Sequence, residues 1–245
     1  MMNPAFAHNN IKEMVPTFIR VASTLKELIE DKINKGESEI NLTPYISKAT
    51  LDIIGLVGFN YEFNSLTSSN ELADAYAALF KKLTDEELQY QIMTFLIAGH
   101  ETTSSTTMWA LYLLAKYPHE QDLLREELVK AFPDKSKFNP SFDEINSLEY
   151  LNCIVKETLR THSPVPMISR ANVKDKVIGG YLIPKNTIIM VAISVLHKST
   201  EIWGPTANDF DPKRFDVCIL LNKIMFDYFH KIVDLNVNHA KSISK

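Results

Sequence analysis

Cysteine is nearly absent from this chain, which has only Cys153 and Cys218 among 245 residues. Proteins that depend on disulfides carry several cysteines at characteristic spacings, and two cysteines cannot form such a framework. The sequence therefore argues against a disulfide-stabilised fold and favours a reducing compartment.

Long apolar runs are also missing. The longest candidate, residues 188–196, is far shorter than the roughly 20 residues that a helix needs to cross a bilayer. The first twenty residues, MMNPAFAHNNIKEMVPTFIR, do not combine a basic flank with an apolar core, as a secretory signal does. We therefore expect no membrane span, and a chain that is cytoplasmic or only peripherally attached to a membrane.

Clustered positive charge is a third absence. The chain has 26 lysines and arginines against 30 aspartates and glutamates, a net charge of −4, and no basic cluster interleaved with aromatic residues. These features give no support for nucleic-acid binding. The composition that remains, 45% hydrophobic and 23% charged, is typical of an ordinary globular protein.

Apolar residues recur at helical spacing over most of the chain. From Val177 the pattern changes to β-branched runs separated by Gly-Gly and Pro-Lys-Asn turns, which predicts a small sheet. The fold class is therefore mainly α with a small β region. We expect helices at residues 11–35, 44–59, 70–82, 84–117, 118–132 and 148–162.

The helix expected at residues 84–117 is the longest. Thr84, with Glu87 three residues later, forms a capping-box pattern at its start, and Pro118 ends it. At about 1.5 Å per residue the helix is roughly 50 Å long, enough to cross a whole domain. We expect this central helix to organise the fold.

A polar run, from Gly99 to Thr103, interrupts the apolar pattern of the central helix. A zinc-protease motif would need a second histidine one turn after His100, and Ser104 stands there instead, so we assign no metal ligand. A threonine hydroxyl can bond to the carbonyl one turn back, bend the helix and open a groove in which a neighbouring carboxylate relays protons. The alternative is a Gly/Thr kink that is covered by a partner helix.

A pair of opposite charges lies on the helix expected after residue 148. Glu157 and Arg160 are three residues apart on one face and can form an ion pair. Most such pairs are exposed and contribute little to stability, but the flanking residues here are apolar, which predicts burial. A buried pair needs a further partner, and Arg214 in the segment FDPKRF is the candidate.

Three motifs follow one another in order: AGHETT at residues 98–103, ETLR at 157–160 and FDPKRF at 210–215. Each is weak alone, but the ordered set resembles the catalytic half of a eukaryotic-type cytochrome P-450, a haem-thiolate monooxygenase. The segments THSPVPMISR and IGGYLIPKNT are also typical of that family. The resemblance covers about residues 1–215 and implies a partial cytochrome P-450 fold built around the long central helix.

The resemblance also implies roles for single residues. Glu101 and Thr102 resemble the catalytic acid–alcohol pair that guides protons to iron-bound dioxygen, where the thiolate ligand favours cleavage of the O–O bond. Ala98 and Gly99 are expected over the haem face. Arg170 matches a position that often contacts a haem propionate through a charge-assisted hydrogen bond.

The two later motifs resemble the structural triad that holds the core beneath the haem, here Glu157, Arg160 and Arg214. Members of the family insert one oxygen atom of O₂ into an apolar organic substrate. The resemblance therefore implies haem as cofactor, and a small apolar substrate and an NADPH-dependent reductase as partners. It places intact relatives at the endoplasmic reticulum membrane.

The family supplies its iron ligand from a loop of the form F-x-x-G-x-R-x-C-x-G, well after the FDPKRF-like segment. Residues 216–245 contain no such loop, and Cys218 has no glycine beside it. Glycines let this loop approach the porphyrin and direct amides at the sulfur. We therefore expect residues 216–245 to be a divergent tail outside the family fold, and Cys218 to be an incidental small hydrophobe.

Two other segments of the family pattern are also expected to be missing. One is the anchor and haem-contact helix that would precede Met1, and the other is the substrate-roof segment, which implies an internal deletion near residues 82–84. We therefore expect this chain to be inactive, although it carries the motifs of a monooxygenase. The alternative is a non-catalytic helical remnant or a truncated gene product.

Overall fold

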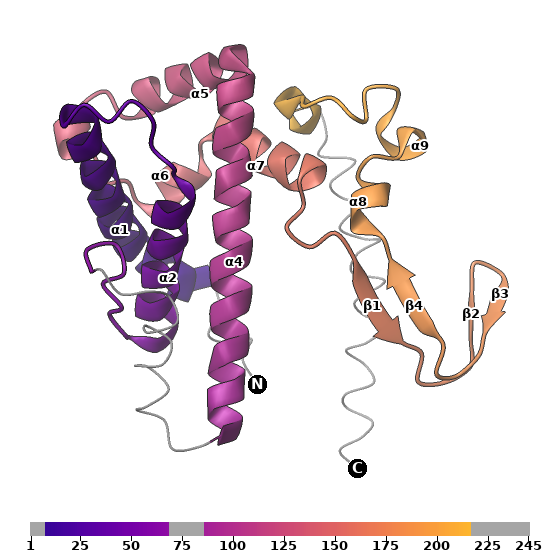
Figure 1. The fold of residues 1–245 in the computed structure, drawn as a ribbon. Coiled ribbons are helices and arrows are strands. Elements are labelled where there is room, and N and C mark those ends of the chain that lie inside the picture. Colours follow the sequence, from indigo (N-terminus) through magenta and orange to yellow (C-terminus); the bar gives the residue numbers. More distant parts are fainter. Residues whose placement is uncertain (1–7, 69–85, 217–245) are drawn as a thin grey trace.

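The computed structural model describes residues 8–68 and 86–216. Most of them are helical, and the sheets are small (Figure 1). The longer helices are α1 (His8–Asn34), α2 (Thr43–Phe59), α4 (Glu86–Lys116), α5 (Pro118–Ala131) and α7 (Glu149–Thr161). The short ones are η2 (Lys135–Lys137), α6 (Phe142–Asn146), α8 (Ile193–Leu196), α9 (Thr200–Trp203) and η3 (Pro212–Phe215).

The helices end where the sequence indicated. Gly36, with φ +85°, follows α1, because glycine adopts the left-handed conformation that terminates a helix without steric cost. Pro118 ends the helical pattern of α4 and begins α5, where its missing N–H needs no partner. The helix expected at residues 70–82 and the Thr84 cap lie outside the described residues.

The strands form two antiparallel pairs. β2 (Lys176–Ile178) and β3 (Tyr181–Ile183) form a hairpin whose turn residues, Gly179 and Gly180, both have positive φ, as a tight hairpin turn requires. β4 (Ile188–Val191) pairs with β1 (Ile168–Ala171), with Ile168 opposite Val191. The change of pattern at Val177 therefore predicted the β region, and β1 begins in the segment THSPVPMISR, which the family resemblance alone assigned to the sheet region.

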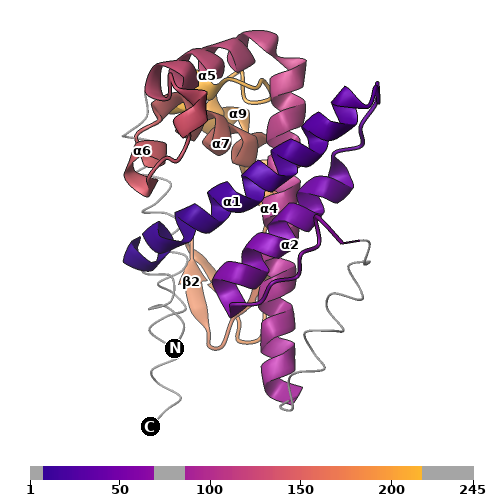
Figure 2. The ribbon, with the colours of Figure 1, turned by 90° about the vertical axis from the view of Figure 1, so that its left-hand side faces the viewer.

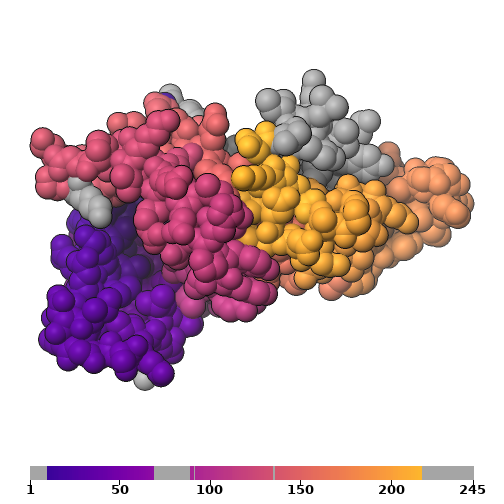
Figure 3. All heavy atoms as spheres, turned by 90° about the horizontal axis from the view of Figure 1, so that it is seen from above, coloured from indigo at the N-terminus to yellow at the C-terminus, as the bar shows by residue number. Residues whose placement is uncertain are grey.

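Helix α4 lies between the two halves of the described structure. In Figure 1, α1 and α2 lie on one side of α4, and the strands with α8 and α9 lie on the other. Figure 2 shows α1 crossing α2 and α4 obliquely, and Figure 3 shows the two halves at opposite ends of the molecule. The prediction that the central helix organises the fold is confirmed.

The buried apolar residues form separate clusters, and α4 contributes to two of them. Leu96 packs with Leu51 of α2 and Phe63 of the loop after α2. Leu113 packs with Ile154 of α7 and Phe210 near η3. A third cluster, made by Val21, Ala49 and Leu66, holds α1 against α2. Burial of these side chains is the main force that holds the helices together.

The carboxylate of Glu127 on α5 holds the start of α7. It accepts hydrogen bonds from the backbone N–H groups of Tyr150 at 2.7 Å and Leu151 at 2.9 Å. A carboxylate at a helix N-terminus satisfies unpaired amides and complements the helix dipole. The Tyr150 hydroxyl also bonds to Glu120 of α5. These contacts orient α7, which carries Glu157 and Arg160.

Candidate functional site

The polar run on α4 is divided between two sides of the helix. Leu96, His100 and Ser104 follow one another at four-residue spacing and are 0%, 3% and 9% exposed. Ala98 and Glu101 are exposed and Thr102 is half-buried. A helix turns by about 100° per residue, so Ala98 and Thr102 lie on the side opposite Leu96. We call the side with Ala98, Glu101 and Thr102 the open face.

Threonine side chains in this part of α4 bond to the carbonyl one turn earlier. The Thr102 hydroxyl donates to the Ala98 carbonyl oxygen at 2.6 Å, and Thr106 donates to Thr102 at 2.8 Å. The predicted hydrogen bond is therefore present. Figure 1 shows α4 as one continuous helix through these residues, and the bend and groove remain predictions.

Gly99 lies on the α2 side of α4 rather than on the open face. A Cβ at this position would lie 3.0 Å from Cδ1 of Ile54, so the absence of a side chain lets α2 and α4 approach closely. Ala98 and Gly99 were expected together over one surface, but the structure separates them. The position of Gly99 fits the alternative interpretation of the polar run, in which a partner helix covers it.

His100 is the buried polar residue of the α2–α4 contact. Its Nε2 atom lies 2.9 Å from the Ser47 hydroxyl oxygen of α2, and its Nδ1 atom has no partner among the described residues. Burial lowers the pKa of His100 below its ordinary value, while Ser47 and the Glu101 charge act in the opposite direction. The imidazole is therefore neutral at pH 7. The sequence analysis assigned no role to this residue beyond excluding zinc.

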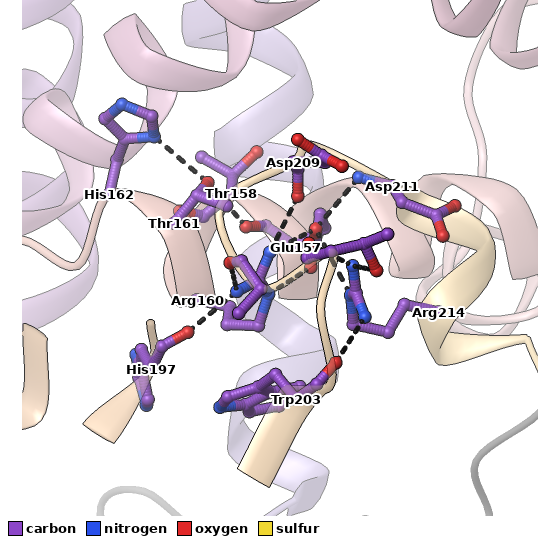
Figure 4. A network of polar contacts seen from close by, with 12 residues as sticks. Glu157, Thr158, Arg160, Thr161, His162, His197, Trp203, Asp209, Asp211 and Arg214 are labelled. Carbon is purple, nitrogen blue, oxygen red and sulfur yellow. Dashed lines mark hydrogen bonds and ion pairs between the residues drawn. The ribbon is translucent and has the colours of Figure 1, made fainter. Parts of the chain in front are cut away.

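Glu157 and Arg160 form a buried bidentate ion pair on α7 (Figure 4). Arg160 Nε and one terminal nitrogen of Arg160 each lie 2.7 Å from a different carboxylate oxygen of Glu157. The Arg160 side chain is 2% exposed and the Glu157 side chain is 0% exposed. The two parallel bonds give the pair a fixed geometry. The prediction that this pair is buried is correct.

The remaining nitrogens of Arg160 bind backbone carbonyls from a distant part of the chain. They donate to His197 at 2.7 Å, Ala207 at 2.6 Å and Asp209 at 2.9 Å. The Asp211 backbone N–H donates to Glu157 at 2.9 Å. One ion pair thus anchors the segment from α8 to η3 on α7, and motif reading could not find these carbonyl partners because every residue has one.

Arg214 reaches the same carboxylate at longer range. Its Nε atom lies 3.7 Å from Oε1 of Glu157 and makes no hydrogen bond. Its terminal nitrogens bond to the carbonyls of Trp203 at 3.0 Å and Thr206 at 2.8 Å. The structure therefore brings Glu157, Arg160 and Arg214 together, as Figure 4 shows, with Arg214 as an electrostatic third member.

Arg170 lies on β1, away from this network. It is exposed, forms no ion pair with another described residue, and donates to the adjacent Ser169 carbonyl at 2.8 Å. The structure thus leaves its charge available to an anion, but it does not bring Arg170 into contact with Glu101 or Thr102.

A haem would need an axial ligand as well as a face and a cation. The open face of α4 and the exposed Arg170 fit the periphery of such a group. Cys153 is the only cysteine among the described residues; it is buried on α7, and burial raises the pKa of its thiol above the ordinary value. Cys153 lies within α7 and is buried among protein side chains, so it is not presented to an external ligand, and Cys218 lies outside the described residues.

Other ligand and membrane features were also searched in residues 8–68 and 86–216. That part of the chain holds no group of three His, Cys, Asp or Glu side chains that could bind a metal ion. It contains no helix long and apolar enough to cross a membrane. A cavity of about 170 Å³ lies between α1, α2 and the loop after α2, and none of the predicted site residues lines it.

Comparison with known proteins identifies the family. The cytochrome P-450 family pattern matches residues 1–81 and 73–218, which is most of the chain. The chain belongs to the cytochrome P-450 family, whose members are haem-iron monooxygenases. The mainly helical structure with its small antiparallel sheets is accordingly a partial cytochrome P-450 domain.

Individual relatives match over different lengths. Cytochrome P-450 monooxygenase 205 of Postia placenta is 30% identical over 322 residues, 88% of this chain and 59% of the relative. The bifunctional cytochrome P-450/NADPH–P-450 reductase 2 of Bacillus subtilis is 30% identical over 87% of this chain and 26% of its own length. Cytochrome P-450 3A29 of Sus scrofa is 40% identical over 55% of this chain. The chain spans less than two thirds of the length of these relatives.

Proposed function

We propose that these residues form part of a haem-dependent monooxygenase that inserts one oxygen atom of O₂ into a small apolar organic substrate. Family membership supports the class of reaction. The observation that carries the assignment of the site is the division of the polar run. His100 and Gly99 are used in helix packing, whereas Glu101 and Thr102 are left on a side of α4 where no packing requirement explains them.

Glu101 and Thr102 would together supply protons. The exposed Glu101 carboxylate can exchange protons with solvent, and the neighbouring Thr102 hydroxyl can pass one on while its oxygen stays within hydrogen-bond distance of the Ala98 carbonyl. A bound haem would supply the iron at which dioxygen is activated. Its face would lie against Ala98, and Arg170 would pair with a propionate.

The triad residues would act on the scaffold rather than on the substrate. Arg160 fixes the backbone at His197, Ala207 and Asp209, and Glu157 fixes Asp211. These contacts hold the chain that leads into residues 216–245 against α7. We propose a structural role for Glu157, Arg160 and Arg214, consistent with their burial and with their bonds to backbone groups.

We also propose that a polypeptide of these 245 residues alone binds no haem through a thiolate. Cys153 is buried within α7, and no glycine flanks Cys218. Residues 1–215 would form a partial domain with a deletion near residues 82–84. The match to the Postia placenta relative supports this view, because it extends over 322 residues although the chain has 245. A non-catalytic helical remnant is the second candidate, favoured by the burial of Cys153.

Partners of an active relative follow from the same proposal. The Bacillus subtilis relative carries a cytochrome P-450 and an NADPH-dependent reductase in one chain, according to its name. We propose that an NADPH-dependent reductase would supply electrons here too. Attachment to the endoplasmic reticulum membrane would depend on segments other than the described helices.

The experiment is a haem titration of the purified 245-residue chain, followed by the carbon monoxide difference spectrum of the reduced protein. We expect no thiolate-type Soret band, with a Cys218→Ser variant giving the same spectrum. A thiolate-type band that disappears in Cys218→Ser would show that the chain is competent and that Cys218 is its iron ligand. Stoichiometric haem binding without that band would contradict the remnant alternative.

A further inference from the structure

The contact between α2 and α4 contains a polar link that packing does not require. On the α4 side the contact includes Leu96, Gly99 and His100, and on the α2 side it includes Ser47, Leu51 and Ile54. A leucine at position 100 would continue the apolar stripe. The chain has instead a histidine that is 3% exposed and whose Nδ1 has no partner among the described residues.

The link is the hydrogen bond between His100 Nε2 and the Ser47 hydroxyl, at 2.9 Å. A hydrogen bond fixes one relative position of two helices, whereas apolar packing tolerates neighbouring positions. A polar pair in an otherwise apolar contact usually contributes more to the specificity of an arrangement than to its stability. The geometry of this pair therefore bears on how α4 is rotated about its own axis.

Rotation of α4 decides where Glu101 and Thr102 point. Adjacent residues on a helix are about 100° apart, so a shift by one residue would turn Glu101 toward α2 and Gly99 away from it. The close approach of Gly99 to Ile54, at 3.0 Å for a Cβ built on the glycine, would then be lost. His100 lies directly between Gly99 and Glu101 and makes the only hydrogen bond from this part of α4 to α2 among the described residues.

We propose that His100 is a positioning residue, whose hydrogen bond to Ser47 sets the rotation of α4 so that Glu101 and Thr102 occupy the open face, and which loses this effect when its imidazole is protonated. The proposal deepens, and rests on, the proposed proton-supplying role of Glu101 and Thr102. Protonation would put a positive charge on the ring and an N–H on each ring nitrogen in this buried position, where Nδ1 has no hydrogen-bond partner among the described residues.

The charged surroundings of His100 are simple. On its own helix the neighbouring charge is Glu101, and the group that α2 presents to it is the uncharged Ser47. Burial is the largest influence on its pKa and opposes protonation. The neutral imidazole is therefore the form that fits the contact, and acid is the condition that would release it.

Cysteine accessibility in the full 245-residue chain tests the proposal without haem. One reporter is Ala98→Cys on the open face, and the other is Ser104→Cys on the opposite side of α4, each combined with Cys218→Ser so that Cys153 is the only other cysteine in the sequence. The measured quantity is the reaction rate of the Ala98→Cys protein with a small methanethiosulfonate reagent divided by that of the Ser104→Cys protein. A ratio cancels most of the pH dependence of thiol reactivity, and the buried Cys153 is common to both proteins.

We expect the Ala98→Cys reporter to react much faster than the Ser104→Cys reporter at pH 7.5. Adding Ser47→Ala should reduce the ratio by about tenfold. In the reporter proteins that keep His100, lowering the pH from 7.5 to 5.5 should reduce the ratio of labelling rates. His100→Gln can still donate a hydrogen bond to Ser47 but does not titrate, so it should keep a high ratio at both pH values.

Leu96→Ala serves as the packing control, because it weakens the same contact without touching the hydrogen bond. Leu96→Ala should leave the dependence of the labelling ratio on pH unchanged, whatever its effect on the size of the ratio. A ratio that Ser47→Ala leaves within about twofold of the parent would overturn the proposal, as would an equal pH dependence in His100→Gln. Because labelling needs no haem, the outcome of the haem titration bears only on the proposed function, and the labelling ratio bears only on the role of His100.

Discussion

Buried charge at the scale of single residues is concentrated in Glu157 and Arg160. Removing such groups from water costs several kcal/mol, which only near-complete hydrogen bonding can offset. Here Arg160 binds both carboxylate oxygens and three backbone carbonyls, and its guanidinium lies 5.1 Å from the centre of the Trp203 ring. Arg214, bonded to two carbonyls, adds a second positive charge beside Glu157.

Arg160→Ala should therefore abolish soluble expression of the chain. It would leave Glu157 buried with Arg214, 3.7 Å away, as its remaining counter-charge, and would leave three carbonyls without their donor, a loss of about 3–5 kcal/mol. Arg160→Lys should rescue little, because one ammonium group cannot reproduce the forked geometry. Yield of soluble protein and the urea midpoint of any soluble fraction measure the effect.

Arg125→Ala is the matched control. Arg125 also pairs with an acidic residue on its own helix, Asp122, but both side chains are more than half exposed. Such pairs contribute about 0–1 kcal/mol. Equal solubility of Arg160→Ala and the parent chain would contradict the buried-network description.

At the scale of elements, two glycines near the end of α2, Gly55 and Gly58, differ in how much space surrounds them. A Cβ on Gly55 would lie 2.4 Å from the Phe63 ring and 2.7 Å from the Tyr61 carbonyl oxygen. A Cβ on Gly58 would meet only Ile54 of the same helix, at 3.5 Å. The structure therefore shows close packing at Gly55 and only ordinary van der Waals contact at Gly58.

Gly55→Ala and Gly58→Ala should therefore change the free energy of unfolding in opposite directions. At Gly55 overpacking against Phe63 should cost about 1–3 kcal/mol. At Gly58 the gain in helix propensity should stabilise the chain by up to about 1 kcal/mol. Urea unfolding followed by far-ultraviolet circular dichroism compares the two variants. A destabilised Gly58→Ala, or an unaffected Gly55→Ala, would contradict the contacts described here.

The element boundaries show how far sequence patterns reach. The bounds of α1, α2, α4, α5 and α7 follow from helical spacing and from glycine and proline at the ends, because these signals are local. The pairing of β4 with β1 joins residues separated by the β2–β3 hairpin. Strand pairing across such a distance depends on the positions of whole elements, so the sequence pattern indicated β structure without indicating the partner.

At the scale of the whole molecule, three histidines that folding shields from water couple stability to pH: His100 is buried, and His162 and His197 are half-buried. Burial lowers the pKa of His100, His162 and His197 below the ordinary value of 6.5, and nearby lysines add to the effect at His162. The unfolded chain would therefore take up protons below about pH 6.5 that the folded chain does not bind. The free energy of unfolding should fall as pH decreases through this range and be fully present above it.

Urea unfolding at pH 7.5 and 5.5 measures this coupling. We expect a lower urea midpoint at pH 5.5, and a smaller difference between the two pH values in His100→Gln. His119→Gln is the control, because His119 is exposed on α5. A midpoint that does not change between the two pH values would contradict the burial of the three histidines as titrating groups.

The described long helices, the family and the residues of the three motifs could be predicted from the amino-acid sequence, because helical period, caps and ordered motifs are local properties of the chain. The pairing of Glu157 with Arg160 could also be predicted, since three-residue spacing places them on one helical face. The side of α4 that each polar residue occupies, the contact of Gly99 with Ile54 and the bond of His100 to Ser47 became visible only in the folded chain. These outcomes depend on the packing of α2 against α4, in which residues some fifty positions apart meet, and no local pattern encodes that contact.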